Sequence, residues 1–251
     1  MTHYLIADAH LFPPPAEHPG RERLLDFLGS LLEGEPAALW ILGDLFDFWF
    51  EYRSVAPAGH WRVLSALRAL TDAGWNVRAL PGNHDSWLGG SFEEATGARV
   101  LPERIARAEL AGRRAVLAHG DGLGPGDIGY RFLLRPVLRA RLSAFLFGLL
   151  HPDLGRGLAR LFSGTSRRIL RRSVEELPPG LARWAEGELD SAELVVTAHT
   201  HVPVIRSLPG GIHLSLGDWI RSFSWARVDR EGVALYCNGD LADSGPWPEG
   251  A

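Results

Sequence analysis

The sequence predicts a single α/β domain over residues 1–251, with a helical insertion, or cap, at about 122–190. Its 251 residues, 46% of them hydrophobic, are enough for one domain with a substantial core. Strand-like and helical patterns alternate from His3 to Leu80, as an α/β fold requires. Short clusters of Asp, His and Asn directly follow strand-like runs. The sequence therefore places reactive groups where buried strands end.

The elements follow from the spacing of apolar residues. Five apolar runs predict the main strands: His3–Ala7, Ala38–Leu42, Asn76–Leu80, Arg114–Ala118 and Glu193–Ala198. Helical periodicity separates the first three runs, around Arg21–Leu32 and Trp61–Ala73. After His201, shorter alternating runs between Gly-containing turns predict further strands: Val204–Leu208, Gly211–Leu216, Ser224–Val228 and Val233–Asn238. The Pro/Gly-rich tail Gly245–Ala251 is expected to be frayed.

The composition favours a cytoplasmic protein. The net charge of −4 gives no general attraction to nucleic acid. Cys237 is the only cysteine, which excludes an intrachain disulfide and suits a reducing compartment. The chain starts with a strand-like run and not with a secretory signal. The longest strongly apolar stretch, Leu142–Leu150, is far shorter than the roughly 20 residues of a membrane span.

The predicted insertion is basic and apolar at once. Gly122 to Arg172 holds ten arginines and two aspartates, a local net charge of +8. Within it, Leu138, Leu142, Phe145 and Leu149 share one line at helical spacing, after Pro136 as a helix start. Two explanations stay open. The line packs on the core while the arginines face water, or the helix is a lid that holds a lipid-like substrate or rests on an anionic membrane.

Five motifs carry the predicted chemistry: Asp8-Ala9-His10, Gly43-Asp44-Leu45-Phe46-Asp47, Gly82-Asn83-His84-Asp85, His119-Gly120-Asp121 and His199-Thr200-His201. Residues i and i+2 of a strand point to the same face, so both Asp-x-His and His-x-His can hold one ion. The count gives four ligands to each of two ions. The first set is Asp8, His10, Asp44 and His201; the second is Asp44, Asn83, His119 and His199.

Mixed nitrogen and oxygen ligands without thiolate suit Mn²⁺, Fe²⁺ or Zn²⁺. Two such ions about 3.5–4 Å apart generate hydroxide and neutralise phosphoryl oxygens during in-line displacement. We expect His84 to protonate a leaving oxygen or to contact the phosphate, and Asp85 to orient its imidazole. Taken singly, Asn83 is most often a turn residue, and Asp44 or Asp47 could each be a turn residue that caps a helix. Five such coincidences at five strand ends are far less plausible than one site.

In their order and residues, these motifs resemble the calcineurin-like metallophosphoesterases. That resemblance implies a four-layer αββα sandwich. Within the superfamily, Gly43–Trp49, Asp127-Ile128-Gly129-Tyr130 and the basic insertion are similar to the LpxH-type UDP-2,3-diacylglucosamine pyrophosphatases. The resemblance implies hydrolysis of UDP-2,3-diacylglucosamine to lipid X and UMP in lipid A biosynthesis. It further implies two Mn²⁺ ions, a cap that receives two acyl chains, and a peripheral location on the inner membrane.

The resemblance also suggests substrate contacts at Asn83, Asp127, Tyr130 and Ser166, and the arginine fork suits phosphate contacts at Arg167 and Arg171. The expected partners are a nucleotide-sugar lipid and an anionic inner-membrane surface, with no nucleic acid and no obligate protein partner. His84 stands where the best-known branch has arginine. The alternative is therefore a broader phosphoesterase acting on other phosphodiesters or phosphoproteins. A scaffold that has lost catalysis is disfavoured, because none of the seven ligands is missing.

Overall fold

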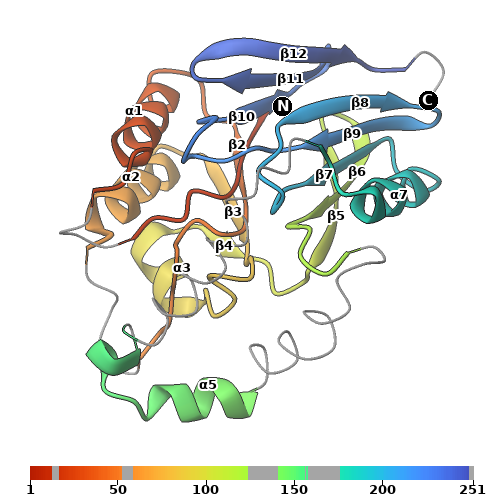
Figure 1. Ribbon diagram of the computed structural model, residues 1–251. Coiled ribbons are helices and arrows are strands. Elements are labelled where there is room, and N and C mark those ends of the chain that lie inside the picture. Colours follow the sequence, from red (N-terminus) through yellow and green to blue (C-terminus); the bar gives the residue numbers. More distant parts are fainter. Residues whose placement is uncertain (13–16, 53–58, 124–140, 156, 158–175, 249–251) are drawn as a thin grey trace.

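The computed structural model describes residues 1–12, 17–52, 59–123, 141–155, 157 and 176–248. Its strands form two mixed sheets packed face to face, with helices on the outer face of each (Figure 1). This four-layer αββα arrangement confirms the predicted fold class. The helices that build it, together with one that lies apart from the sheets, are α1 (Arg21–Leu31), α2 (Trp61–Asp72), α3 (Gly90–Thr96), α5 (Arg141–Gly148) and α7 (Pro179–Glu188).

The first sheet has the strand order β12-β11-β10-β1-β2-β3-β4. Its strands are β1 (His3–Ile6), β2 (Ala38–Leu42), β3 (Asn76–Leu80), β4 (Arg99–Val100), β10 (Trp225–Val228), β11 (Gly232–Cys237) and β12 (Asp240–Pro246). β1, β2, β3 and β4 run parallel, and β10 pairs antiparallel with β1. Ile6 lies opposite Ile41, and Leu42 opposite Leu80. The loops that follow β1, β2 and β3 therefore leave the sheet at one edge.

The second sheet has the order β5-β6-β7-β9-β8. Its strands are β5 (Ile105–Leu110), β6 (Arg113–Ala118), β7 (Leu194–Thr197), β8 (Val204–Leu208) and β9 (Gly211–Ser215). β6, β7 and β9 run parallel, and the edge strands β5 and β8 are antiparallel to their neighbours. The carboxyl ends of β6 and β7 thus also share an edge.

Side-chain alternation assigns the layers. In β2, Leu39 and Ile41 pack with the buried faces of α1 and α2, whereas Trp40 and Leu42 pack between the sheets. α2 buries Val63, Leu64, Leu67 and Leu70, one stripe at helical spacing. On the far side, Ala185 and Leu189, in and just after α7, pack on Val116 and Val195 of the second sheet.

All nine predicted strands are present, with ends shifted by at most one residue, but three further strands were not predicted. β5 alternates only weakly, and β4 is two residues long. β12 is almost wholly exposed and is held by its pairing with β11. Gly245 and Pro246 belong to β12, so the prediction that the tail frays from Gly245 is wrong at its start.

α7 and α5 both fall within the range 122–190 that the sequence predicts as a helical insertion, and they differ in their packing. α7 covers the second sheet and is part of the sandwich. α5 lies apart from both sheets (Figure 1), and Phe147 joins it to the rings of Phe48, Phe50 and Trp87 at centroid distances of 5.4, 4.8 and 5.2 Å.

The outer face of α5, continued by Leu149 just after the helix, is apolar. Leu142, Phe145 and Leu149 are 65%, 64% and 69% exposed, so the explanation that this line packs on the core is wrong for these three residues. The remainder of the line, Leu138, and the predicted start at Pro136 lie outside the described residues. In the described part of the chain, none of the helices is both long enough and apolar enough to span a membrane.

Candidate metal centre

Five loops meet at the shared edge of the two sheets, and backbone hydrogen bonds tie them together. They follow β1, β2, β3, β6 and β7, the strands that precede the five predicted motifs. The amides of Asp8 and His10 donate to the carbonyls of Gly43 and Asp44, at 3.1 and 2.8 Å. The amide of His199 donates to Asp8 Oδ2 at 2.8 Å, which joins the second sheet to the first.

The predicted ligands adopt an unusual backbone conformation. Eight non-glycine residues of the described chain have positive φ, and five of them are predicted ligands: Asp8 (52°), His10 (45°), Asp44 (53°), His199 (69°) and His201 (60°). This left-handed region costs an L-residue of order 1–2 kcal/mol, and such strain concentrates at functional sites. β1 and β7 end before these residues. Each pair therefore converges through left-handed turns and not through the pleat of a strand.

Glycine permits the closest approach at this edge. Gly43 has φ of +86°, and a Cβ placed there would lie 2.6 Å from His119 Nδ1 and 2.7 Å from Gly82 Cα. No side chain fits in that space, because real Cβ contacts are longer than 3.0 Å. The glycine before Asp44 therefore brings the loops after β2, β3 and β6 into contact.

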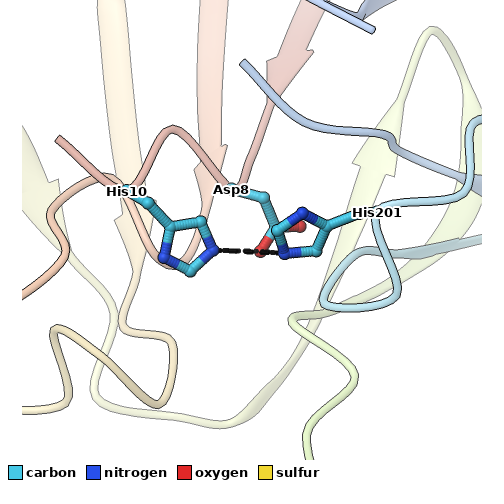
Figure 2. A group of neighbouring side chains, drawn as sticks. All are labelled: Asp8, His10 and His201. Atoms are coloured by element: carbon cyan, nitrogen blue, oxygen red, sulfur yellow. Dashed lines mark hydrogen bonds and ion pairs between the residues drawn. The ribbon is translucent and has the colours of Figure 1, made fainter. Parts of the chain in front are cut away.

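Asp8, His10 and His201 form the first of three clusters whose ligand atoms all lie within 4.8 Å of one another (Figure 2). His10 Nε2 and His201 Nε2 are 3.2 Å apart. Asp8 Oδ1 lies 3.5 Å from the first and 3.7 Å from the second. Within the described residues this buried oxygen accepts no hydrogen bond, and His10 Nδ1 has no partner either. Two imidazole nitrogens facing one carboxylate oxygen are the donor set of a divalent cation.

Asp44, His119 and His199 form a second cluster. Asp44 Oδ2 lies 3.3 Å from His119 Nε2, and Asn83 Oδ1 lies 3.1 Å from the same nitrogen. Asp44 Oδ2 is also 3.8 Å from His10 Nε2 of the first cluster. The structure thus brings all seven predicted ligands together, with the carboxylate of Asp44 between the two groups.

His84 belongs to a third cluster, with His10 and Asp44. Its ring meets that of His10 edge to face, at a centroid distance of 4.7 Å. His84 Nδ1 donates to the backbone carbonyl of Asp47 at 2.9 Å, because a carbonyl can only accept. Nδ1 therefore carries a proton, and Nε2 is left to act on a ligand. Asp47 orients this imidazole.

Asp85 does not have the role predicted from the sequence. Its carboxylate accepts hydrogen bonds from the backbone amides of Gly82, Asp44 and Leu45, at 2.7 to 3.1 Å, and not from the ring of His84. Burial raises the pKa of Asp85 to about 6, and the charge of Asp44 adds to the rise. Asp85 joins the loops after β2 and β3. The prediction that it orients His84 is corrected accordingly.

Two other histidines are fixed at Nδ1 in the same way. His119 Nδ1 donates to the carbonyl of Leu42 at 2.8 Å, and His201 Nδ1 donates to Asp218 Oδ2 at 3.0 Å. Sequence reasoning missed Asp218. Gly217-Asp218 follows the strand-like run Gly211–Leu216 just as Gly43-Asp44 follows β2, and that repeated Gly-Asp after a strand was the available signal.

The buried carboxylates and imidazoles of the centre shift one another's pKa. Burial alone would raise the pKa of Asp44, but the charges of His119, His84 and His10 outweigh it and hold the pKa well below its usual value. Burial alone would lower the pKa of His119, but Asp44 and Asp8 raise it well above its usual value. The carboxylates and imidazoles thus each favour the charged form of the other. A divalent cation would supply positive charge at the same place, so the residues fit a metal centre.

The structure describes only one of the predicted substrate contacts. Asn83 lies in the cluster beside His119. The remaining predicted contacts, Asp127, Tyr130, Ser166, Arg167 and Arg171, lie outside the described residues.

Comparison with known proteins identifies a matching family model and relatives that align over nearly their whole length. The model of the calcineurin-like phosphoesterase family matches residues 1–203. A UDP-2,3-diacylglucosamine hydrolase from Stenotrophomonas maltophilia is 32% identical over 255 residues, which cover 94% of this chain and 98% of that protein. A protein of the same name from Porphyromonas gingivalis is 31% identical over 262 residues, covering 95% and 98%.

Solved structures share the fold at much lower identity. Yfce, a phosphoesterase from E. coli, matches with a TM-score of 0.51 and 17% identity, covering 99% of this chain and 100% of that one. A double mutant of Vps29 from Entamoeba histolytica matches with a TM-score of 0.50 and 14% identity over the same shares. These likenesses concern the fold alone.

Proposed function

Because the chain belongs to the calcineurin-like phosphoesterase family, we propose that it is a two-metal hydrolase of UDP-2,3-diacylglucosamine. It cleaves the diphosphate to give UMP and 2,3-diacylglucosamine 1-phosphate (lipid X), a step of lipid A biosynthesis. The observation that carries the proposal is the extent of the similarity. It runs over nearly the whole of this chain and of the relatives, and is not confined to the metal motifs.

The two ions are divalent, and we assign Mn²⁺ from the resemblance to the LpxH-type enzymes. Imidazole, carboxylate and amide donors without thiolate are compatible with that ion. When bound, they would lower the pKa of water and neutralise phosphoryl oxygens. Asp8, His10 and His201 would hold one ion and Asn83, His119 and His199 the other, with Asp44 shared. In the reaction, the oxygen of water bonds to one phosphorus and that phosphorus loses the bridging oxygen. Two phosphate monoesters result, and the two hydrogens of the water are released as protons once both phosphates are fully ionised.

His84 would act on the diphosphate. The leaving group is a phosphate, whose oxygen is a weak base, so it needs less protonation than an alkoxide would. We therefore assign His84 Nε2 a hydrogen bond to a phosphoryl oxygen, with Nδ1 held by the Asp47 carbonyl. This contact suits a histidine as well as the arginine of the best-known branch.

α5 supplies what a diacylated substrate requires. Its outer face is apolar and exposed. Phe147 of α5 packs on the ring of Trp87, which follows His84 closely in the sequence. Acyl chains on that face would remove exposed apolar surface from water. The arginine-rich block around it offers cations for phosphate, and we keep Arg167 and Arg171 for that role, with Asp127, Tyr130 and Ser166 as further contacts. The same apolar and basic character suits a cytoplasmic protein that rests peripherally on the anionic inner membrane.

The first prediction concerns the products. Incubation of the Mn²⁺-loaded protein with UDP-2,3-diacylglucosamine should yield UMP and lipid X, identified by mass spectrometry. Protein treated with EDTA should give neither until Mn²⁺ is restored. Intact substrate together with turnover of a simple diester such as bis-p-nitrophenyl phosphate would overturn the assignment in favour of a broader phosphoesterase.

The second prediction concerns α5. The double variant Phe145→Ser, Leu149→Ser should lower kcat/KM on the diacylated substrate about 10²-fold, because burial of each side chain is worth about 1.5–3 kcal/mol. Activity on acyl-free UDP-glucosamine should not change. Sedimentation with phosphatidylglycerol vesicles should fall in parallel.

Leu241→Ser provides the matched control, since Leu241 is also exposed, at 57%, but lies on β12. Equal losses in both variants, or equal losses on both substrates, would show that α5 has no part in acyl-chain recognition.

A further inference from the structure

Asp218 is buried beside the metal centre without belonging to the ligand set. We propose that Asp218 is a positioning residue, which fixes the tautomer and ring orientation of His201 and so tunes one of the two metal sites. This inference rests on the proposed two-metal function. It makes the metal affinity of one site depend on a side chain from the loop between β9 and β10.

The carboxylate of Asp218 is held in one orientation. Its Oδ1 accepts hydrogen bonds from the amides of Ile220, Arg221 and Ser222, at 3.0, 2.7 and 3.0 Å. Rotation of the carboxylate would break these bonds, so Oδ2 remains directed at His201 Nδ1, 3.0 Å away. A carboxylate accepts but does not donate, so His201 Nδ1 carries the proton and Nε2 presents its lone pair to the site.

His201 depends on this anchor more than its neighbours depend on theirs. Its side chain is 21% exposed, whereas that of His119 is 2% exposed and is confined by packing. His119 and His84 are held at Nδ1 by backbone carbonyls, which no substitution removes. A carboxylate also raises the basicity of the imidazole it holds, and loss of such a partner typically costs 10–100-fold in metal affinity.

The loop that carries Asp218 makes a second contact with the same site. The amide of Trp219 donates to the carbonyl of Asp8 at 3.2 Å. One loop therefore contacts both Asp8 and His201, two members of the first cluster. We expect an altered Asp218 to weaken this site and to leave the site of His119 and His199 intact.

Asp218→Asn tests the inference with little change of shape. Oδ1 of the asparagine would keep the three backbone amides, and its NH₂ group would face His201 Nδ1. That nitrogen must then accept, and the proton moves to Nε2, where it blocks metal binding. We expect Mn²⁺ titration, followed by EPR and calorimetry, to show two sites in the wild type. In the variant, one site should be weakened 10–100-fold and the other unchanged.

A second readout needs no metal. The ¹⁵N shifts of the His201 imidazole in metal-free protein should report Nδ1–H in the wild type and Nε2–H in Asp218→Asn. Ser224→Ala is the control, because it removes hydrogen bonds of the same loop, to the Ser222 hydroxyl and to the Asp218 backbone carbonyl, and none to the carboxylate. We expect it to retain both metal sites and the wild-type tautomer.

The outcomes separate the two hypotheses. A wild-type protein that binds no Mn²⁺ would overturn the proposed function itself. Two sites in the wild type, with unchanged affinities and tautomer in Asp218→Asn, would overturn only the positioning role. Equal weakening in Ser224→Ala would also overturn it, because loop packing and not the carboxylate would then be responsible.

Discussion

Asp44→Asn should reduce kcat by at least about 10³-fold, which corresponds to about 4 kcal/mol of lost transition-state stabilisation. Asp44 is the carboxylate common to both ligand groups. Its Oδ2 faces His119 Nε2 at 3.3 Å and His10 Nε2 at 3.8 Å, and its Oδ1 accepts the amide of His84 at 2.8 Å. An amide can place only one oxygen between the groups and carries no charge. Both ions should therefore bind more weakly.

The test measures metal content by inductively coupled plasma mass spectrometry, and kcat on UDP-2,3-diacylglucosamine. Asp44→Asn should retain fewer than two ions per chain after dialysis. Asp72→Asn is the matched control, since this exposed carboxylate pairs with Arg68 along α2. Retention of two ions and of activity within tenfold of the wild type would refute the bridging role of Asp44.

The convergence of the ligands could be predicted from the sequence, but its cause could not. Motifs that follow parallel strands must meet, because carboxyl ends share an edge of the sheet. The prediction for Asp8 and His10 rested on the two-residue period of a strand. The structure instead places both residues in left-handed turns beyond β1. A backbone strained by its neighbours leaves no local sequence signature, because the contacts that hold it come from the loops after β2 and β7.

Asp85 and Asp218 make tertiary contacts that their positions in the sequence do not predict. Asp85 adjoins His84 in sequence, which suggested a contact, yet its carboxylate binds amides of the loop after β2. Asp218 is 17 residues from His201 and orients it. Sequence spacing identifies neighbours within one element, whereas these contacts depend on how separate loops pack.

The sequence predicts the helical line of α5 but not the direction in which its apolar side chains point. Periodicity predicts a helix with an apolar line through Leu142, Phe145 and Leu149, and a helix is present. Periodicity does not indicate whether that line faces the core or the solvent, since both give the same pattern. In the structure the partly buried Phe147 makes the contact with Phe50 and Trp87, and the predicted line stays exposed.

Gly82→Ala should destabilise the protein by about 3 kcal/mol and lower kcat at least about 10²-fold, although it adds a single methyl group. A Cβ at Gly82 would lie 2.1 Å from Asp44 Oδ1 and 2.6 Å from Asp44 N. The first atom belongs to the carboxylate that we propose is shared by both ions, and it accepts the hydrogen bond from the His84 amide. The second is backbone, so neither can move without cost. Displacement would also strain the hydrogen bond from the Gly82 amide to Asp85, which is 2.7 Å long.

Gly29→Ala is the matched control, because the same methyl group at this exposed position of α1 meets nothing within 4 Å. It should stabilise the helix by about 0.5–1 kcal/mol and leave activity unchanged. Thermal and urea unfolding of both variants, in metal-free and Mn²⁺-loaded form, separates strain from metal loss. If close packing of Asp44 on Gly82 creates the site, Gly82→Ala must lose stability even without metal. Wild-type stability in the metal-free variant would mean that the loops after β2 and β3 part freely, and that metal, not packing, holds the centre together.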